Sequence, residues 1–242
     1  MRRLIVASLC LAFPLAAAAQ DTSPKKPWTT TFGGGLAITS GNSDTRNYNL
    51  SFNTKYDPKT AFLFKADALY LLGKSNGEKQ VDKANADVRG EYTVSPRTFT
   101  FGELAYLRDP FKDISYSIAP LAGAGYRLIQ TTSRTLSVDG AAGAVVERDL
   151  SFGRTTSGAL KSGETFEWTI SPTSKLTQKL TGLWKTRDFA DALYHFDTGL
   201  TTTVATRVEL KLAYTYDYKN KPAVAGIKKG DTALFAALLL KF

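Results

Sequence analysis

Hydrophobic and polar residues alternate along most of the chain, and this pattern predicts β-strands. In the stretch "TRNYNLSFNTKYDPKTAFLFKADALYLLG", residues 45–73, one face carries Tyr48, Leu50 and Phe52, while the other carries asparagine, serine and lysine. An Asp-Pro pair then separates this run from a second one that repeats the apolar face. Because successive side chains of a strand point to opposite sides, a period of two indicates strands with one apolar and one polar face.

The same pattern recurs from Trp28 to Phe242 and predicts twelve strands, most of about ten to thirteen residues. The phase of the fifth run, residues 98–108, is ambiguous. Proline, aspartate and serine predict tight turns at one edge of the sheet. These turns are expected at residues 57–59, 95–97, 131–134, 171–174 and 205–206. Longer and more charged loops are expected at the other edge, at residues 73–82, 108–114, 147–155, 186–192 and 219–230. The connections therefore predict an up-and-down meander.

Alternation alone does not decide which face points inward, because soluble and membrane barrels each have one polar and one apolar face. Strands of this length match a tilted crossing of a hydrocarbon layer and exceed the usual length in soluble sheets. An even number of strands, with short turns at one edge and longer loops at the other, is typical of outer-membrane barrels. The pattern favours an all-β fold, a twelve-stranded antiparallel up-and-down transmembrane β-barrel.

Aromatic residues near both ends of the strands add to this interpretation. Their rings favour the boundary between lipid and water and form girdles around outer-membrane barrels. The expected interface residues are Trp28, Tyr48, Tyr56, Tyr70, Trp168, Trp184 and Tyr216. The final run, residues 231–242, ends in Phe242 and resembles the terminal signal that the barrel-assembly machinery reads.

The first residues predict export. Two arginines precede an apolar run and then small residues, which is the pattern of a secretory signal peptide over residues 1–19. Cys10, the only cysteine, lies within the apolar run, behind a bulky leucine, and this position argues against a lipoprotein. Residues 20–27 read as a flexible lead, and residues 28–242 as one barrel domain. The expected location is the outer membrane of a Gram-negative bacterium.

The charge of the chain suits an anionic surface. The formal net charge is +9, and without Arg2 and Arg3 it is +7, from 29 basic and 22 acidic residues. Such a charge fits contact with lipid and lipopolysaccharide. An exported chain rarely meets nucleic acid, so no nucleic-acid partner is expected.

The polar face predicts a charged lumen in which the two signs nearly balance. The expected lumen-lining residues are Lys55, Lys65, Asp67, Lys83, Asp87, Arg89, Glu91, Arg127, Glu209 and Lys211. One hypothesis is a narrow pore in which these cations select anionic solutes. The other is a salt-bridged interior that blocks passage and braces the wall, because charges out of bulk water tend to pair. The second is favoured.

Candidate catalytic chemistry is sparse. His195, the only histidine, shares the lumen side with Asp197, but no nucleophile motif accompanies it, so a hydrolase is a remote alternative. One histidine and no cysteine beyond Cys10 do not make a transition-metal site, and no cofactor is expected. Asn42 and Asp44 offer a few oxygen donors for calcium without a recognisable loop motif.

Small residues on the outer face of the sixth and seventh runs allow close approach of another wall, and this suggests a weak homo-oligomer contact. These residues are Ala122, Ala124, Gly140, Ala142 and Ala144. Loose selection against lipid explains them equally well.

Three segments resemble a known family. They are "GGGLAITSGNSDTRNYNLSFNTKY", "PLAGAGYRLIQTTSRTLSVDGAAGAVVERD" and the closing "LKLAYTYDYKNKP" with "KKGDTALFAALLLKF". They are similar to the YdiY-like, salt-induced outer-membrane proteins (domain of unknown function 481). The resemblance covers nearly the whole chain after residue 19. It implies an outer-membrane β-barrel of undetermined role, with no catalytic residues to carry over. The sequence as a whole predicts a non-enzymatic, porin-like envelope protein with passive transport or wall integrity as its physical role.

Overall fold

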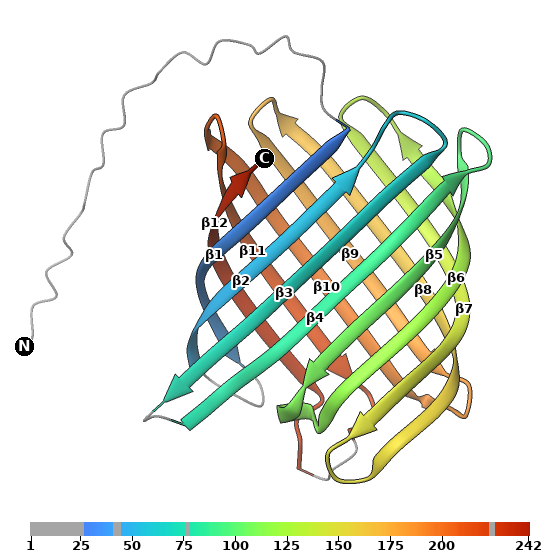
Figure 1. Cartoon of the computed structure of the whole chain (residues 1–242), viewed down its shortest axis with the longest axis vertical. Helices are drawn as coiled ribbons and strands as arrows, with labels where there is room; N and C mark the ends of the chain where they lie inside the picture. The colour runs from blue at the N-terminus through green and yellow to red at the C-terminus, as the bar shows by residue number, and fades with distance from the viewer. Residues whose placement is uncertain (1–26, 41–44, 76–77, 223–225) are drawn as a thin grey trace, which may run out of the picture.

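The computed structural model describes residues 27–40, 45–75, 78–222 and 226–242 of the chain. The expected signal peptide, most of the lead and the Asn42–Asp44 loop lie outside the described residues. The described residues form a closed barrel of twelve antiparallel strands in which each strand pairs with its neighbours in sequence (Figure 1). The fold expected from the alternation is therefore confirmed.

The strands, with one short 3-10 turn between the fifth and the sixth, are β1 (Trp28–Ser40), β2 (Thr45–Tyr56), β3 (Phe62–Ser75), β4 (Glu78–Thr93), β5 (Thr98–Asp109), η1 (Pro110–Lys112), β6 (Ile114–Gln130), β7 (Arg134–Asp149), β8 (Gly153–Ser171), β9 (Ser174–Lys185), β10 (Asp188–Ala205), β11 (Val208–Lys219) and β12 (Gly230–Lys241). Within the described part of the chain, no helix is long and apolar enough to cross a membrane.

The first and last strands close the barrel. β1 pairs with β12 in a continuous antiparallel register from Thr31 opposite Lys241 to Ser40 opposite Thr232. Phe242 adds a backbone N–H bond to the Thr30 carbonyl at 2.9 Å. Closure leaves no free sheet edge, because every strand has a paired neighbour on both sides.

The start of β1 and the end of β12 lie at one end of the barrel, together with the connections at 57–61, 94–97, 131–133, 172–173 and 206–207 (Figure 1). We call this the terminal edge and the opposite end the distal edge. Asp57 forms one of these turns: its carboxylate accepts bonds from the backbone N–H and Nζ of Lys59, a residue with a positive φ of 62°. Partial burial would raise the pKa of Asp57, but these bonds and the lysine charges outweigh it and lower the pKa.

Three of the loops predicted at the distal edge are wrong. Residues 73–82, 147–155 and 186–192 are mostly strand, because β3, β4, β7, β8 and β10 continue through them. The strands therefore range from 12 to 19 residues, and β3, β4, β6, β7, β8 and β10 are longer than expected. Asp82, Glu147 and Asp191 in these stretches pair with residues of other strands, so a charged residue here does not by itself mark a loop.

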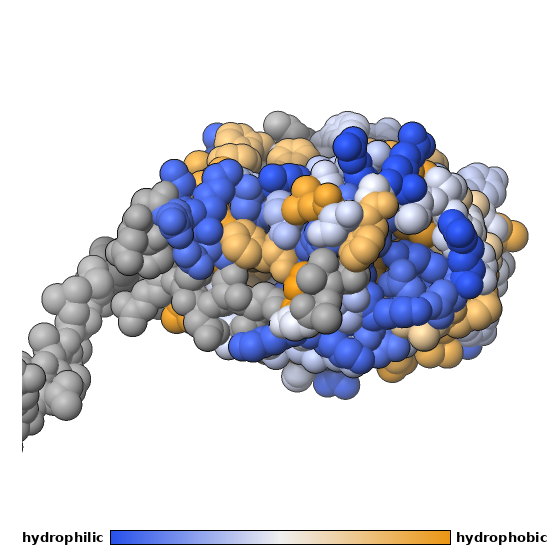
Figure 2. Space-filling model, turned by 90° about the horizontal axis from the view of Figure 1, so that it is seen from below, coloured by the Kyte–Doolittle hydropathy of each residue, from blue (hydrophilic) through white to orange (hydrophobic). Residues whose placement is uncertain are grey.

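Exposure shows that the apolar face points outward. Tyr48, Leu36 and Leu238 are 72%, 67% and 58% exposed, whereas Glu103 and Lys112 inside the barrel are 5% and 3% exposed. Hydrophilic residues also cover much of the distal edge, with hydrophobic residues between them and along the rim (Figure 2). The polarity is inverted relative to a soluble barrel, whose apolar side chains would fill the interior.

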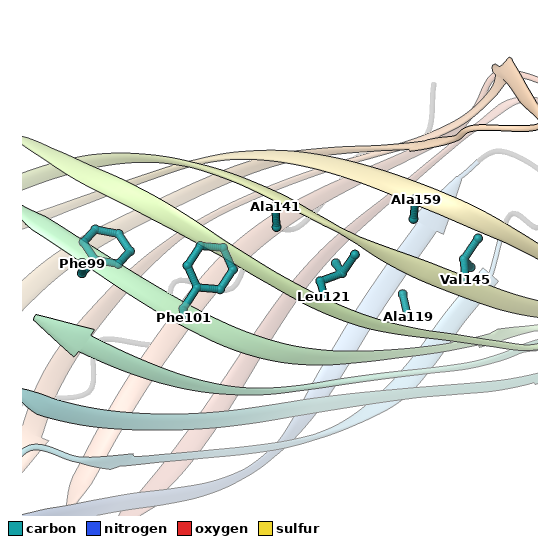
Figure 3. Packing of buried hydrophobic residues seen from close by; sticks show 7 residues of the cluster. All are labelled: Phe99, Phe101, Ala119, Leu121, Ala141, Val145 and Ala159. Atoms are coloured by element: carbon teal, nitrogen blue, oxygen red, sulfur yellow. The ribbon is translucent and has the colours of Figure 1, made fainter. Parts of the chain in front are cut away.

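The ambiguous fifth run has a simple explanation. Phe99 and Phe101 of β5 point inward and are buried, while Leu104 of the same strand points outward and is exposed. Both faces of β5 are therefore apolar, and alternation could not set its phase. The two phenylalanines belong to an interior cluster with Leu121, Val145 and three alanines (Figure 3).

Candidate functional site

The barrel interior is the site where charged side chains gather. All of the charged positions expected to line the lumen lie on the inward side of the sheet, which the strand register sets. They do not form one group. Arg89, Glu91 and Lys65 belong to one ion-pair network, and Lys83 belongs to another nearer the distal edge.

The central network is built around Arg89 of β4. Its guanidinium donates to Glu91, Glu103 and Asp139, each at 3.0 Å, through Nε, Nη1 and Nη2. The second carboxylate oxygen of Glu103 accepts from Lys161 of β8. The side chain of Glu103 has no exposed surface, so both of its ionic partners are needed to balance a charge removed from water.

Aromatic rings support the same arginine. The Arg89 guanidinium lies 3.5 Å from the ring centre of Phe101 and 5.8 Å from that of Phe99. A planar cation over an aromatic face is attracted to it and is held in one orientation. Figure 3 shows both rings in line along the inner surface of β5. The central network is therefore packed against an apolar wall as well as bonded to carboxylates.

A second network, the distal network, joins opposite sides of the barrel. Lys83 of β4 forms an ion pair with Asp217 of β11, whose other oxygen contacts Nδ1 of His195 at 2.8 Å. β4 and β11 are five strands apart around the barrel, so the Lys83 bridge crosses the lumen.

The turn η1 closes part of the distal edge. Lys112 at its end is buried, donates to the backbone carbonyls of Asp217 and Lys229 at 3.0 and 3.3 Å, and pairs with Asp231 at 3.2 Å. These contacts draw the β5–β6 connection inward toward β11 and β12. The sequence predicted a loop at this connection, but it did not predict that the connection lies in the mouth of the barrel.

Alternate strands are also linked near this edge. Glu147 of β7 accepts from Lys185 of β9 at 2.7 Å and from Lys219 of β11 at 3.2 Å, and Lys185 also contacts Asp191 at 2.6 Å. Glu147, Lys185 and Lys219 are buried. The alternation predicts that Glu147 faces the lumen, although a loop was expected to begin at this residue. Asp191 was expected in a loop, and only continued alternation through that stretch could have shown that it belongs to a strand.

A small cavity remains between η1 and the wall. Its volume is about 40 Å³, and it is lined by Lys83, Asp109, Phe111, Asp217 and Asp231, among others. This space is enough for a few water molecules. In the described part of the chain, no cluster of histidine, cysteine or carboxylate residues has the arrangement of a metal site.

Like charges face each other nearer the terminal edge. Lys55 is directly opposite Lys65, and Lys65 is opposite Arg89, while Asp67 is opposite Asp87. Like charges on adjacent strands are unfavourable, so nearby opposite charges must compensate. Glu91 accepts from both Lys65 and Arg89, and Lys55 pairs with Asp57 of the turn at 3.4 Å.

The expected interface aromatics lie toward the two ends of the strands. At the terminal edge, Trp28 packs on Tyr56 with ring centres 4.8 Å apart, and Arg134 lies over Trp168. Toward the distal edge, Trp184 donates to the hydroxyl of Tyr194 at 3.2 Å. Tyr70 donates to Asp82 at 3.0 Å, while Tyr48 and Tyr216 are exposed.

His195 does not pair with Asp197 as its sequence neighbourhood suggested. Its contact is with Asp217, which is also engaged by Lys83. Within the described residues, no serine or threonine hydroxyl is hydrogen-bonded to His195. The geometry is that of a polar contact inside an ionic network.

The closed up-and-down barrel is the fold of known outer-membrane porins and channels. The NanC porin is 10% identical, with 87% of this chain and 100% of that chain covered and a TM-score of 0.58. An outer-membrane channel from Pseudomonas putida F1 is 10% identical, with 94% of this chain and 100% of that chain covered and a TM-score of 0.53. The translocator domain of the autotransporter NalP from Neisseria meningitidis is 9% identical, with 91% of this chain and 90% of that chain covered and a TM-score of 0.51. At these identities the likeness extends to the fold alone.

Residues 33–242 match the family described as "Protein of unknown function, DUF481", and the chain belongs to this family. Among curated proteins, none matches the chain.

Proposed function

We propose that the protein is a non-enzymatic β-barrel of the outer membrane of a Gram-negative bacterium, exported by a signal peptide over residues 1–19. The apolar outer face supports this placement, because side chains such as Leu36 and Leu238 are exposed where a hydrocarbon layer would cover them. Both ends of the barrel would lie in water, with the terminal edge in the periplasm and the distal edge outside the cell. Phe242 would serve as the signal for the barrel-assembly machinery.

The proposed role is a braced wall whose interior blocks free passage of solutes. The observation that carries it is the set of ion pairs between strands that are not neighbours: Lys83 with Asp217, Lys161 with Glu103, and Arg89 with Asp139. Each bridge spans part of the lumen, and the bridges occur at two levels, in the central and distal networks. Opposite charges in a partly dehydrated interior stay paired, because separating them would expose each to an unfavourable environment.

The alternative function is a narrow anion-preferring pore, supported by the basic inward-facing residues and by a fold shared with porins. Passage would require the bridges to open. A hydrolase receives no support from the contacts of His195.

Conductance separates the two functions. The chain lacking residues 1–19, refolded in detergent and inserted into a planar lipid bilayer, is expected to give no unitary steps above the bare membrane. Its folded state in the same preparation is checked by the change in gel mobility on heating that folded barrels undergo. Reproducible steps, with a reversal potential that favours chloride over potassium, would replace the braced wall with the pore.

Lipid, lipopolysaccharide and a second copy of the chain are the proposed partners in the membrane. The small outward-facing residues of β6 and β7, including Ala122 and Ala142, would form the weak homo-oligomer contact. Crosslinking at position 142 that yields only monomer would count against it.

A further inference from the structure

The mouth of the barrel at the terminal edge has more basic than acidic inward-facing side chains. The basic residues are Lys55, Lys65, Arg127, Lys175, Lys211 and Lys241. The inward-facing acids at the same level are Glu91, Glu167 and Glu209. Among the described residues, the networks nearer the distal edge have no such imbalance, because carboxylates pair with the lysines there.

Each glutamate of the mouth is already engaged by a lysine. The pairs are Lys65 with Glu91 at 3.1 Å, Lys175 with Glu167 at 2.6 Å, and Lys241 with Glu209 at 3.2 Å. Lys55 pairs with Asp57 of the adjoining turn at 3.4 Å. Arg127 and Lys211 are left without a carboxylate within 4 Å among the described residues.

Both of these cations are positioned by aromatic rings instead. The Arg127 guanidinium lies 4.8 Å from the ring centre of Phe99, and Nζ of Lys211 lies 5.8 Å from that of Phe235. A ring face attracts a cation without neutralising its charge or occupying its N–H groups. Among the described residues, the Arg127 side chain makes one hydrogen bond, to Thr93 at 3.3 Å, which leaves most of the guanidinium donors available.

The Phe99 ring beneath Arg127 is held in place by its packing. Phe99 is buried against Gly125 of β6, where an added Cβ would come within 2.2 Å of the ring. A larger residue at 125 would displace the ring, so the glycine fixes the ring position that Arg127 uses. Arg127 and Lys211 stand on β6 and β11, five strands apart around the barrel, and both are half-buried.

We propose that the mouth at the terminal edge binds multivalent oxyanions, with Arg127 and Lys211 as the principal contacts. Arginine recognises carboxylate and phosphate groups through paired N–H donors, and partial burial reduces the screening of both charges by salt. Two cations on opposite sides of the mouth favour a ligand with two or more anionic groups over a single one. The site goes beyond the proposed function, since binding does not require that the lumen conduct.

Calorimetric titration of the refolded chain tests this site. The probes are tripolyphosphate for phosphate chemistry and citrate for carboxylate chemistry, in a zwitterionic detergent at low salt. The test variant is R127Q/K211Q. The matched control is K74Q/R154Q, which removes the same charge from exposed positions at the distal edge. R127K is a milder variant that keeps the charge and loses the paired donors.

The expected result is binding of at least one probe that weakens with added salt and falls by on the order of tenfold or more in R127Q/K211Q. The control should bind as the unchanged chain does, and R127K should lie between. Preference for one probe identifies the anionic group. No binding by the folded unchanged chain, or an equal loss in the control, would overturn the proposal. Because binding is measured in detergent, failure here is separate from the outcome of the conductance experiment.

Discussion

Glu103 is the residue on which the central network converges. Its two oxygens accept from Arg89 and Lys161, and its side chain is inaccessible to solvent. Replacing one member of a buried ion pair leaves the partner charges without compensation, which costs about 3–5 kcal/mol.

E103Q is therefore expected to lower the free energy of unfolding by about 3 kcal/mol, measured by urea titration of the barrel in lipid vesicles with tryptophan fluorescence. The control is E167Q. Glu167 pairs with Lys175 where both side chains are more than a third exposed, and pairs of that kind contribute about 0–1 kcal/mol. Equal effects of the two substitutions would show that the central network does not brace the wall.

At this scale the sequence predicts which way a side chain points, but not which residue it meets. Lys83 and Asp217 were both on the polar face, yet they are 134 residues apart and meet only because the barrel closes. Lys161 and Glu103, which are 58 residues apart, also meet only because the barrel closes, and the ambiguous phase of β5 left the direction of Glu103 open. Such pairs depend on the stagger between strands around the whole barrel, and no local pattern records it.

Strands and turns were largely predictable because each carries its own signal. Alternation identified the strands, and Asp-Pro and Ser-Pro pairs identified three of the five turns of the terminal edge. The distal ends of several strands were predicted too early, because β7 and β10 extend through charged residues such as Glu147 and Asp191 that form ion pairs. The phase of β5 could not be settled because Phe99 and Leu104 make both of its faces apolar.

Gly35 of β1 allows the close approach of β12 that closes the barrel. A Cβ on this β1 residue would lie 1.9 Å from the carbonyl oxygen of Ala236 on β12, a backbone atom that can move only with its strand. G35A should therefore reduce the yield of folded barrel on refolding, measured as the heat-sensitive fraction on gels.

G102A is the matched control, because nothing lies within 4 Å of the added atom on β5. It should refold like the unchanged chain. If G35A also refolds in full yield and unfolds at the same urea concentration, the pairing of β1 with β12 is looser than the register indicates.

For the whole molecule, the account depends on one physical arrangement. The exposed apolar side chains, such as Tyr48, Leu36 and Leu238, lie on the outside of the barrel, and the ion pairs lie inside it beside a small apolar cluster, so the surroundings that we propose are apolar. In the proposed membrane, closure satisfies the backbone, the interior networks narrow the lumen, and the two ends of the barrel would meet water. Fold class and polarity could be inferred from the sequence, but the degree of lumen filling could not, because it depends on side-chain pairs across the barrel.

The most direct measurement compares two adjacent residues of β11 in a lipid bilayer. Leu212 points outward and Lys211 inward, and no cysteine lies beyond Cys10, so L212C and K211C can each carry a single fluorescent label. We expect nitroxide groups on lipid acyl chains to quench the label at position 212 strongly and the label at position 211 weakly. Equal quenching, or stronger quenching at position 211, would contradict the outward placement of the apolar face.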